Sequence, residues 1–395
     1  MRSAARPVRG SRPSNRRELI LDAATELFAA RGYEAVNVAD VAVEVAVAPS
    51  ALYRYFRSKE SLLEAVLERA GNTLSIATRS DAEDLEQALH ELATSAMDLR
   101  PLGALYQREA KHLPAPARRH IDAVFATVRH ELGERVAAAV PDITQVESDY
   151  ISVAVLGAIL SPWVHRVDIA RPHLEDLVTQ LALRVVNVPA MNRPRLTTSS
   201  AAAVRAPLGR SSRREVILRA ALDLFAESTF ASVSMNDIAA AAGLASASVY
   251  HHFASKMDLL SIALKRGDAY LQLSLERILY SSTEEAAALR ELVASYSHFA
   301  FSHPTIIDLL ITEARNLPVE DHTAITQSQR EYVNEWVHLY RRLNPKRDEA
   351  EATVIVQGVL MIINDLARLP GLQHRPDVEH YASELAAAGL LLDGP

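Results

Sequence analysis

The sequence predicts an all-α protein built from two copies of one helical module. Ala and Leu, both strong helix formers, dominate a composition with only 13 glycines in 395 residues. A segment near the start of the chain recurs near its middle without a gap, and the apolar residues of both copies recur at helical spacing. These observations favour helices over strands throughout.

The composition excludes several classes of protein. Apolar residues make up 49% and charged residues 23%, as in a folded globular chain. The absence of cysteine excludes disulfides, thiolate zinc sites and a cysteine nucleophile. No glycine-rich nucleotide motif and no hydrolase or zinc-protease motif occurs, so we expect no enzyme activity, cofactor or metal. No apolar run is long enough to span a membrane or to act as a secretory signal, and we expect a cytoplasmic protein.

An internal repeat defines the organisation of the chain. Residues 14–67 and 211–264 share about 22 identities over 54 aligned positions. Fainter similarity follows, since residues 109–114 resemble residues 313–318. A Pro- and Ser-containing stretch between the copies is typical of a linker. The expected order is a basic disordered arm (1–13), a first head (14–74) and body (75–187), the linker (188–210), and a second head (211–271) and body (272–392).

Each head begins with an amphipathic helix followed by two short ones. Apolar residues recur at i, i+3, i+4 and i+7 from Ile20 and from Ile217, and the first helix ends near Gly32. Asn37 and Ser234 are good N-caps for helices over 38–45 and 235–242. After a three-residue break, further helices are expected over 49–55 and 246–252. Two short helices joined by such a turn form a helix-turn-helix, whose second helix enters the major groove of DNA.

Charge and residue type support a DNA contact at these heads. The net charge is −7, but residues 1–60 and 205–256 carry a positive excess, so the remainder is acidic. Small and hydrogen-bonding side chains on the second short helix can approach base edges, Tyr and His can reach phosphates, and a lysine at the next helix N-terminus can bind a phosphate. The predicted contacts are Asn37, Pro49, Ser50, Ala51, Tyr53, Arg54, Tyr55 and Lys59, and in the second head Ser234, Ser246, Ala247, Ser248, Tyr250, His251, His252 and Lys256.

A short motif in both heads resembles a known family. The pattern aliphatic-Tyr-x-[Tyr/His]-Phe-x-Ser-Lys-x-x-Leu occupies residues 52–62 and 249–259, and its phenylalanines, Phe56 and Phe253, are expected in the core. It is similar to the DNA-binding domain of the tetracycline-repressor (TetR) family. That resemblance implies a three-helix DNA-binding head, a ligand-binding helical body and dimerisation through the last two helices. Ala46 replaces the family's usual turn glycine, and Ala48 and Ala245 replace its usual Ser/Thr cap.

The bodies are predicted to supply an interface and an effector site. Long apolar helices are expected over 148–164, 174–186, 349–369 and 378–391, and the resemblance makes them a four-helix interface. With both copies on one chain, they can form an intrachain pseudo-dimer, a homodimer of chains, or both. Aromatic and polar residues that could line a pocket for a small apolar or amphipathic effector are Tyr106, Glu109, His112, Phe125, Trp163, Phe299, Glu313 and Trp336. The alternative for these residues is an ordinary helix-bundle core.

The sequence thus predicts a regulator that binds a double-stranded DNA operator, by family precedent a ligand-responsive repressor. Two alternatives stay open. One is a TetR-fold ligand-binding or scaffolding protein with one vestigial head, favoured by Ala46. The other is a sequence-independent nucleoid protein, which would show a steep dependence on salt and little preference among sequences.

Overall fold

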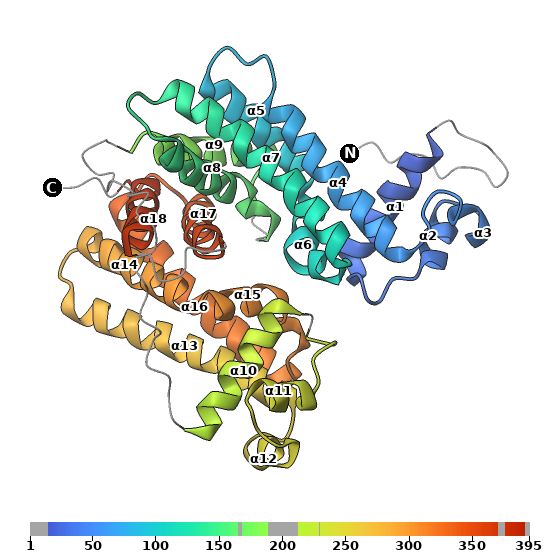
Figure 1. Cartoon of the computed structure of the whole chain (residues 1–395). Helices are drawn as coiled ribbons and strands as arrows, with labels where there is room; N and C mark the ends of the chain where they lie inside the picture. Colours follow the sequence, from blue (N-terminus) through green and yellow to red (C-terminus); the bar gives the residue numbers. More distant parts are fainter. Residues whose placement is uncertain (1–14, 165–167, 189–211, 229, 370–375, 392–395) are drawn as a thin grey trace. The chain divides into compact units, whose positions relative to one another are not determined.

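The computed structural model describes residues 15–164, 168–188, 212–228, 230–369 and 376–391, and every regular element within these ranges is a helix (Figure 1). The all-α prediction is therefore confirmed. The predicted arm (1–13) and all but the first residue of the predicted linker (188–210) lie outside the described residues. The helices form two compact units, Met1–Leu132 with Pro162–Arg166 and Gly133–Ser161 with Val167–Pro395.

The first unit contains the first head and much of the first body. α1 packs against α2, α4 and α6, and α4 packs against α5. The bounds are α1 Arg16–Arg31, α2 Val38–Glu44, α3 Pro49–Leu52, α4 Lys59–Thr78, α5 Leu85–Asp98, α6 Arg100–Glu109, the 3₁₀ turns η1 Ala110–His112 and η2 Ser161–Trp163, and α7 Ala115–Ala139, whose end belongs to the second unit.

The first head forms as its periodicity predicts, with one difference. The predicted face of α1 is buried, and α1 ends at Arg31, followed by its C-cap Gly32, whose φ of +81° suits a residue without a side chain. The third helix, however, ends at Leu52 and does not reach residue 55 as predicted. The carbonyl of Leu52 accepts the N–H groups of both Tyr55 and Phe56, so the chain tightens into a turn there and the helix does not continue.

The second unit contains the second head, the second body and the last two helices of the first module. α10 packs against α11, α13 and α15, and α14 packs against α13, α16 and α18. The bounds are α8 Gln145–Leu160, α9 Arg171–Val186, α10 Arg213–Glu227, α11 Met235–Ala241, α12 Ser246–His252, α13 Lys256–Ser281, α14 Glu285–Ser302, α15 Pro304–Thr312, η4 Ala314–Asn316, α16 Val319–Leu343, α17 Glu349–Ala367 and α18 Pro376–Gly389.

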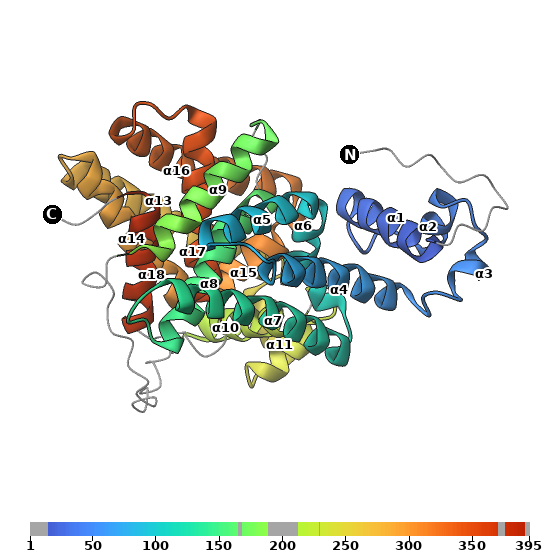
Figure 2. The ribbon, with the colours of Figure 1, turned by 90° about the horizontal axis from the view of Figure 1, so that it is seen from above.

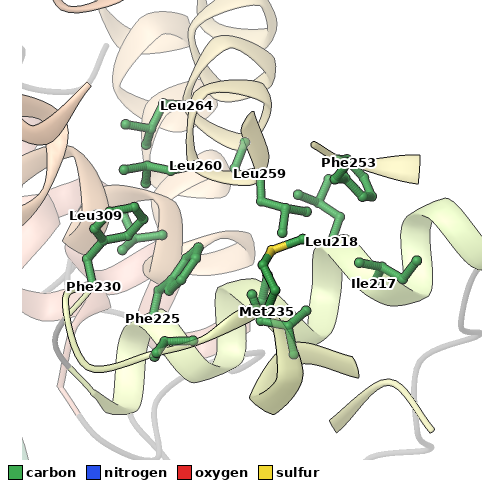
Figure 3. Close-up of a cluster of buried hydrophobic side chains, with 14 of the residues drawn as sticks. Ile217, Leu218, Phe225, Phe230, Met235, Phe253, Leu259, Leu260, Leu264 and Leu309 are labelled. Carbon is green, nitrogen blue, oxygen red and sulfur yellow. The ribbon is translucent and has the colours of Figure 1, made fainter. Parts of the chain in front are cut away.

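One hydrophobic cluster joins the second head to its body. Phe225 and Phe230 of the head lie beside Leu309 of α15 (Figure 3). The same cluster includes Leu317, just after η4, and Ile325 of α16. Burying these side chains together removes apolar area from water on both sides, so the head is packed onto α15 and not merely tethered to it.

Helices from the two modules pack together inside the second unit. α8 lies along α17, while α9 contacts α8, α17 and α18, and these helices lie side by side in both views (Figures 1 and 2). A Cβ on Gly157 would lie 3.3 Å from the backbone of Ile362, and one on Gly358 would lie 3.4 Å from Ser161 Oγ. The same number of positions separates Gly157 from Gly358 as Ser161 from Ile362, so the contact is reciprocal, as across a two-fold axis.

This packing explains why the compact units do not follow the sequence repeat. α8 and α9 belong to the first module by sequence, yet their apolar faces are covered by the last helices of the second. α17 is long and apolar enough to cross a membrane, but 67% of its most apolar window is buried inside the protein, as in the core helix of a bundle. Small residues at the crossing points let the helix backbones approach closely.

Candidate nucleic-acid interface

In both heads the helix-turn-helix is shaped by the same hydrogen bonds. The N–H of Val47 donates to the carbonyl of Ala42 at 2.9 Å, and the N–H of Leu244 donates to Ala239 at 2.9 Å. These bonds form a Schellman motif, which requires a left-handed residue just after the helix. Gly243 meets that requirement with φ +67°, but in the first head an alanine, Ala46, adopts φ +54°.

The N-termini of the short helices differ in how they are capped. The N–H of Asn37 donates to Asp40 Oδ2 at 2.7 Å, and that of Ser234 donates to Asp237 Oδ2 at 2.8 Å. Ser234 Oγ donates to the same carboxylate and accepts the N–H of Asp237. The bonds that the hydroxyl and the backbone N–H of Ser234 donate to the carboxylate hold the pKa of Asp237 below its ordinary value. α3 and α12 have no side-chain cap, because Ala48 and Ala245 stand at their N-cap positions.

The predicted DNA contacts all lie at the surface of the heads. Tyr53, Tyr55 and Tyr250 are 53%, 44% and 55% exposed, so their rings are accessible to a partner. The exposed members of the set are Asn37, Pro49, Ser50, Tyr53, Arg54, Tyr55, Ser234, Ala247, Tyr250 and His251, and the half-buried ones are Ala51, Lys59, Ser246, Ser248, His252 and Lys256.

The aromatic residues between the tyrosines and the serine are part of the core. Phe56 and Phe253 are 4% and 3% exposed, as the pattern predicts. Arg17 and Arg214 lie over their rings, at 5.4 Å and 4.8 Å from the centroids. The rings thus fix the end of the recognition segment while the neighbouring tyrosine remains outside.

The two lysines predicted to bind phosphate make contacts within the heads. Lys59 Nζ donates to the carbonyl of Glu34 at 3.2 Å and lies 4.1 Å from the Tyr33 ring centroid. Lys256 Nζ donates to the carbonyls of residues 230, 231 and 233 at 2.7, 3.1 and 2.9 Å. Sequence reasoning missed these contacts, because no residue pattern reports where turn carbonyls point.

In the first body, the effector candidates separate into three groups. The Tyr106 and Phe125 rings are stacked with centroids 3.9 Å apart. Trp163 donates its Nε1 hydrogen to the carbonyl of Ala96 at 2.7 Å and covers Gly103. Glu109 and His112 face the head: His112 Nε2 lies 3.2 Å from Glu109 Oε2, and its Nδ1 lies 3.1 Å from Glu34 Oε1.

In the second body, Phe299 and Trp336 belong to a larger aromatic group that the sequence prediction missed in part. Phe299 stacks with Tyr270 at 5.4 Å, and Trp336 lies 6.2 Å from Tyr296 and 6.1 Å from Tyr332. The i, i+4 spacing of Tyr332, Trp336 and Tyr340 is the sequence signal that could have identified this cluster.

Two hydroxyl oxygens beside that cluster have no hydrogen-bond partner among the described residues. They are Ser297 Oγ and Tyr340 Oη, both fully buried. The third candidate of this body, Glu313, is buried at the end of α15 and accepts from Asn316 Nδ2. No group of His, Asp and Glu in the described ranges could hold a metal ion.

Comparison with known proteins decides the family. Residues 20–66 and 217–261 each match "Bacterial regulatory proteins, tetR family", so the matches run from α1 into the first part of α4 and from α10 into the first part of α13. A helix-turn-helix (HTH)-type transcriptional repressor of Mycobacterium tuberculosis is 36% identical over 136 residues, which are 32% of this chain and 70% of that protein. The chain belongs to the TetR family.

Other TetR-family proteins are similar over shorter or more divergent stretches. The HTH-type transcriptional repressor KstR2 of Rhodococcus jostii is 35% identical over 112 residues, 27% of this chain and 55% of that protein. Solved structures that align with this chain include a TetR-family regulator from Bordetella parapertussis, which is 21% identical with a TM-score of 0.42 and covers 45% of this chain and 93% of that one. KstR2 of M. tuberculosis is 23% identical with a TM-score of 0.39 and covers 46% of this chain and 95% of that one. This TetR-family chain is a DNA-binding transcriptional regulator, and the relatives named above are transcriptional repressors.

Proposed function

We propose that this regulator is a ligand-responsive repressor that uses two heads on one chain as a covalent pseudo-dimer. The observation that carries the proposal is the packing of α8 and α9 against α17 and α18 within a single polypeptide. Because the linker keeps the modules at an effective concentration near millimolar, this pairing needs no second chain. Each operator would then be bound by one protein molecule in the cytoplasm, at half-sites about one helical turn apart.

The two heads are proposed to read different half-sites. Tyr53 and Tyr250 are equivalent and identical, and we assign both to phosphate contacts. Arg54, however, corresponds to His251, and Tyr55 to His252. Arg can bind both acceptors of a guanine in the major groove, a contact worth about 1–3 kcal/mol of discrimination. An exchange of Arg for His at this position therefore predicts an asymmetric operator.

Selection of bound sequences from a random DNA pool by the full chain tests the proposal. We expect two unlike half-sites and, in sedimentation experiments, one chain per duplex. Arg54→Ala should relax the sequence preference in one half-site only, and His251→Ala in the other, while Tyr53→Phe and Tyr250→Phe should weaken binding without changing preference. A palindromic operator that is protected only by two chains would overturn the pseudo-dimer.

The same experiment distinguishes the alternatives. A vestigial first head, favoured by the left-handed Ala46 and the short α3, would leave binding unchanged in Arg54→Ala. A nucleoid protein would enrich no sequence, and its affinity would fall steeply with salt.

We infer that an amphipathic effector binds in the second body. Support comes from Tyr340 and Ser297, whose buried hydroxyls lack partners among the described residues. Ser297 follows Tyr296 in α14, and Tyr340 comes one helical turn after Trp336 in α16. A buried hydroxyl without a partner is unfavourable, so a ligand that bonds to it gains affinity. Thermal-shift screening with phenolic and amphipathic compounds tests this. A compound that binds should release DNA. Tyr340→Phe should weaken binding of that compound more than the control Tyr332→Phe does, and equal effects of the two variants would contradict the assignment.

A further inference from the structure

The ammonium of Lys256 is fully occupied inside the second head. It lies at the first position of α13 and donates to three carbonyls of the turn between α10 and α11, those of Phe230, Ala231 and Val233. A lysine ammonium has three hydrogens and no acceptor, so these three bonds use all its donors. It also lies 4.6 Å from the centroid of the Phe230 ring, within the range of a cation–π contact.

These bonds connect two segments that the helix-turn-helix depends on. The turn leads directly into α11, whose N-cap Ser234 follows the last of the three carbonyls. The start of α13 follows Phe253 and Ser255, the core residue and the N-cap that end the recognition segment. Lys256 therefore joins the entry of α11 to the exit of α12, across the base of the motif.

The surroundings of the turn make its carbonyls a fixed acceptor site. Phe230 is 7% exposed and lies 5.1 Å from the Phe225 ring, inside the cluster that includes Leu309. With the ring anchored, the carbonyls of the turn are held toward α13. Partial burial lowers the pKa of Lys256, and the carbonyls in turn stabilise its charged form.

The equivalent lysine of the first head is bound less completely. Lys59 donates to one carbonyl, that of Glu34, at 3.2 Å, and lies 4.1 Å from the ring of Tyr33. Among the described residues, two of its hydrogens thus have no carbonyl bond, and these can reach a phosphate without breaking the turn contact. The two lysines occupy matching positions but differ in the donors they have available.

We propose that Lys256 is a positioning residue of the second head, which holds the α10–α11 turn against α13 and so orients α11 and α12, while Lys59 retains a direct phosphate contact. The proposal rests on DNA binding by the heads. A phosphate contact from Lys256 would instead require the ammonium to leave carbonyls at 2.7 and 2.9 Å, giving up bonds already made. Charge alone at this position therefore does not identify a DNA contact.

Hydrogen exchange of the free, full-length protein tests the positioning role without DNA. In Lys256→Met we expect amides at the start of α11 to exchange at least about tenfold faster, since one charge-assisted hydrogen bond corresponds to roughly that factor and this substitution removes three. Lys256→Arg, which keeps the charge and several donors, should restore much of the protection. The matched variant Lys59→Met should change exchange at the start of α2 by a smaller factor.

Binding to a mixed-sequence duplex of about three helical turns separates positioning from phosphate contact. The slope of log affinity against log salt should fall by about 0.9 in Lys59→Met, as expected when one phosphate contact is lost. Lys256→Met should lower affinity with an unchanged slope and an unchanged thermal midpoint of the whole chain. Arg at position 256 should recover affinity as well.

The outcomes are distinct. Unchanged exchange in Lys256→Met together with a slope reduced by about 0.9 would overturn the proposal and restore the phosphate contact. A lower thermal midpoint with unaltered affinity would also overturn it, because the residue would then support stability only. If the wild-type chain bound no DNA at low salt, DNA binding by the heads would fail, whereas the exchange result would still report on the turn.

Discussion

The left-handed alanine of the first head gives the sharpest prediction about stability. Ala46 and Gly243 occupy the same position of the Schellman motif, with φ of +54° and +67°. A residue with a Cβ is destabilised by about 1–2 kcal/mol in this region. Against this, glycine lowers the free energy of unfolding by about 0.4–1 kcal/mol relative to alanine, because it gives the unfolded chain more conformational entropy. The difference leaves glycine favoured by about 0.5–1 kcal/mol at this position. Because a Cβ on Gly243 would meet no atom within 4 Å, the effect there is conformational alone.

We therefore expect Ala46→Gly to stabilise the first head and Gly243→Ala to destabilise the second by similar amounts. The chain contains two compact units, so a single two-state unfolding curve would not isolate either head. Hydrogen exchange reports each head separately through the N–H groups of Val47 and Leu244, which bond across the motif. The expected change is about two- to fivefold slower exchange in Ala46→Gly and the same factor faster in Gly243→Ala.

Each variant carries its own control, because the unmodified head should exchange as in the wild type. Faster exchange in Ala46→Gly, or no change in either variant, would refute the argument that the positive φ is costly here. The same variant bears on function. If the first head binds DNA weakly only because of this alanine, Ala46→Gly should raise the affinity of that head for its half-site.

Two further predictions concern a close contact and a carboxylate. A Cβ on Gly103 would overlap the Trp163 ring, so Gly103→Ala should destabilise the first compact unit by about 1–3 kcal/mol, measured by hydrogen exchange within that unit. The control Gly133→Ala, whose Cβ would have its nearest atom at 3.5 Å, should stabilise the second unit by about 0.5–1 kcal/mol in the same experiment. Since the bonds from Ser234 lower the pKa of Asp237, they contribute fully to folding stability above the ordinary pKa of an aspartate. That stability is lost as the pH falls through the lowered pKa of Asp237. Ser234→Ala should raise the pKa of Asp237 in an NMR titration, and an unchanged pKa would contradict the assignment.

The parts of the fold that depend on local pattern were predictable from sequence. The buried face of α1, the break at Ala46 and Gly243, and the core positions of Phe56 and Phe253 all follow from spacing within one segment, and the structure confirms them. The resemblance to the family, whose pattern has a glycine at this turn, also identified Ala46 as the alanine that adopts positive φ.

Contacts that depend on distant segments could not be predicted. The carbonyls around Lys256 are presented by a turn whose orientation is set by Phe230, and His112 contacts Glu34 only once α6 lies against α1. The end of α3 at Leu52 likewise depends on how Phe56 returns to the core. Residue type showed which groups could interact but not which partner each would find.

The reciprocal contact of α8 and α17 has a consequence for how this protein can change. In a pair of identical subunits every mutation appears on both sides of the axis, so a residue must suit two environments at once. Here Gly157 faces Asp365 while Gly358 faces Leu181, and either side can be altered without its counterpart. A fused gene thus frees its halves from shared inheritance of each change, and specialised roles for the two halves can arise by single substitutions.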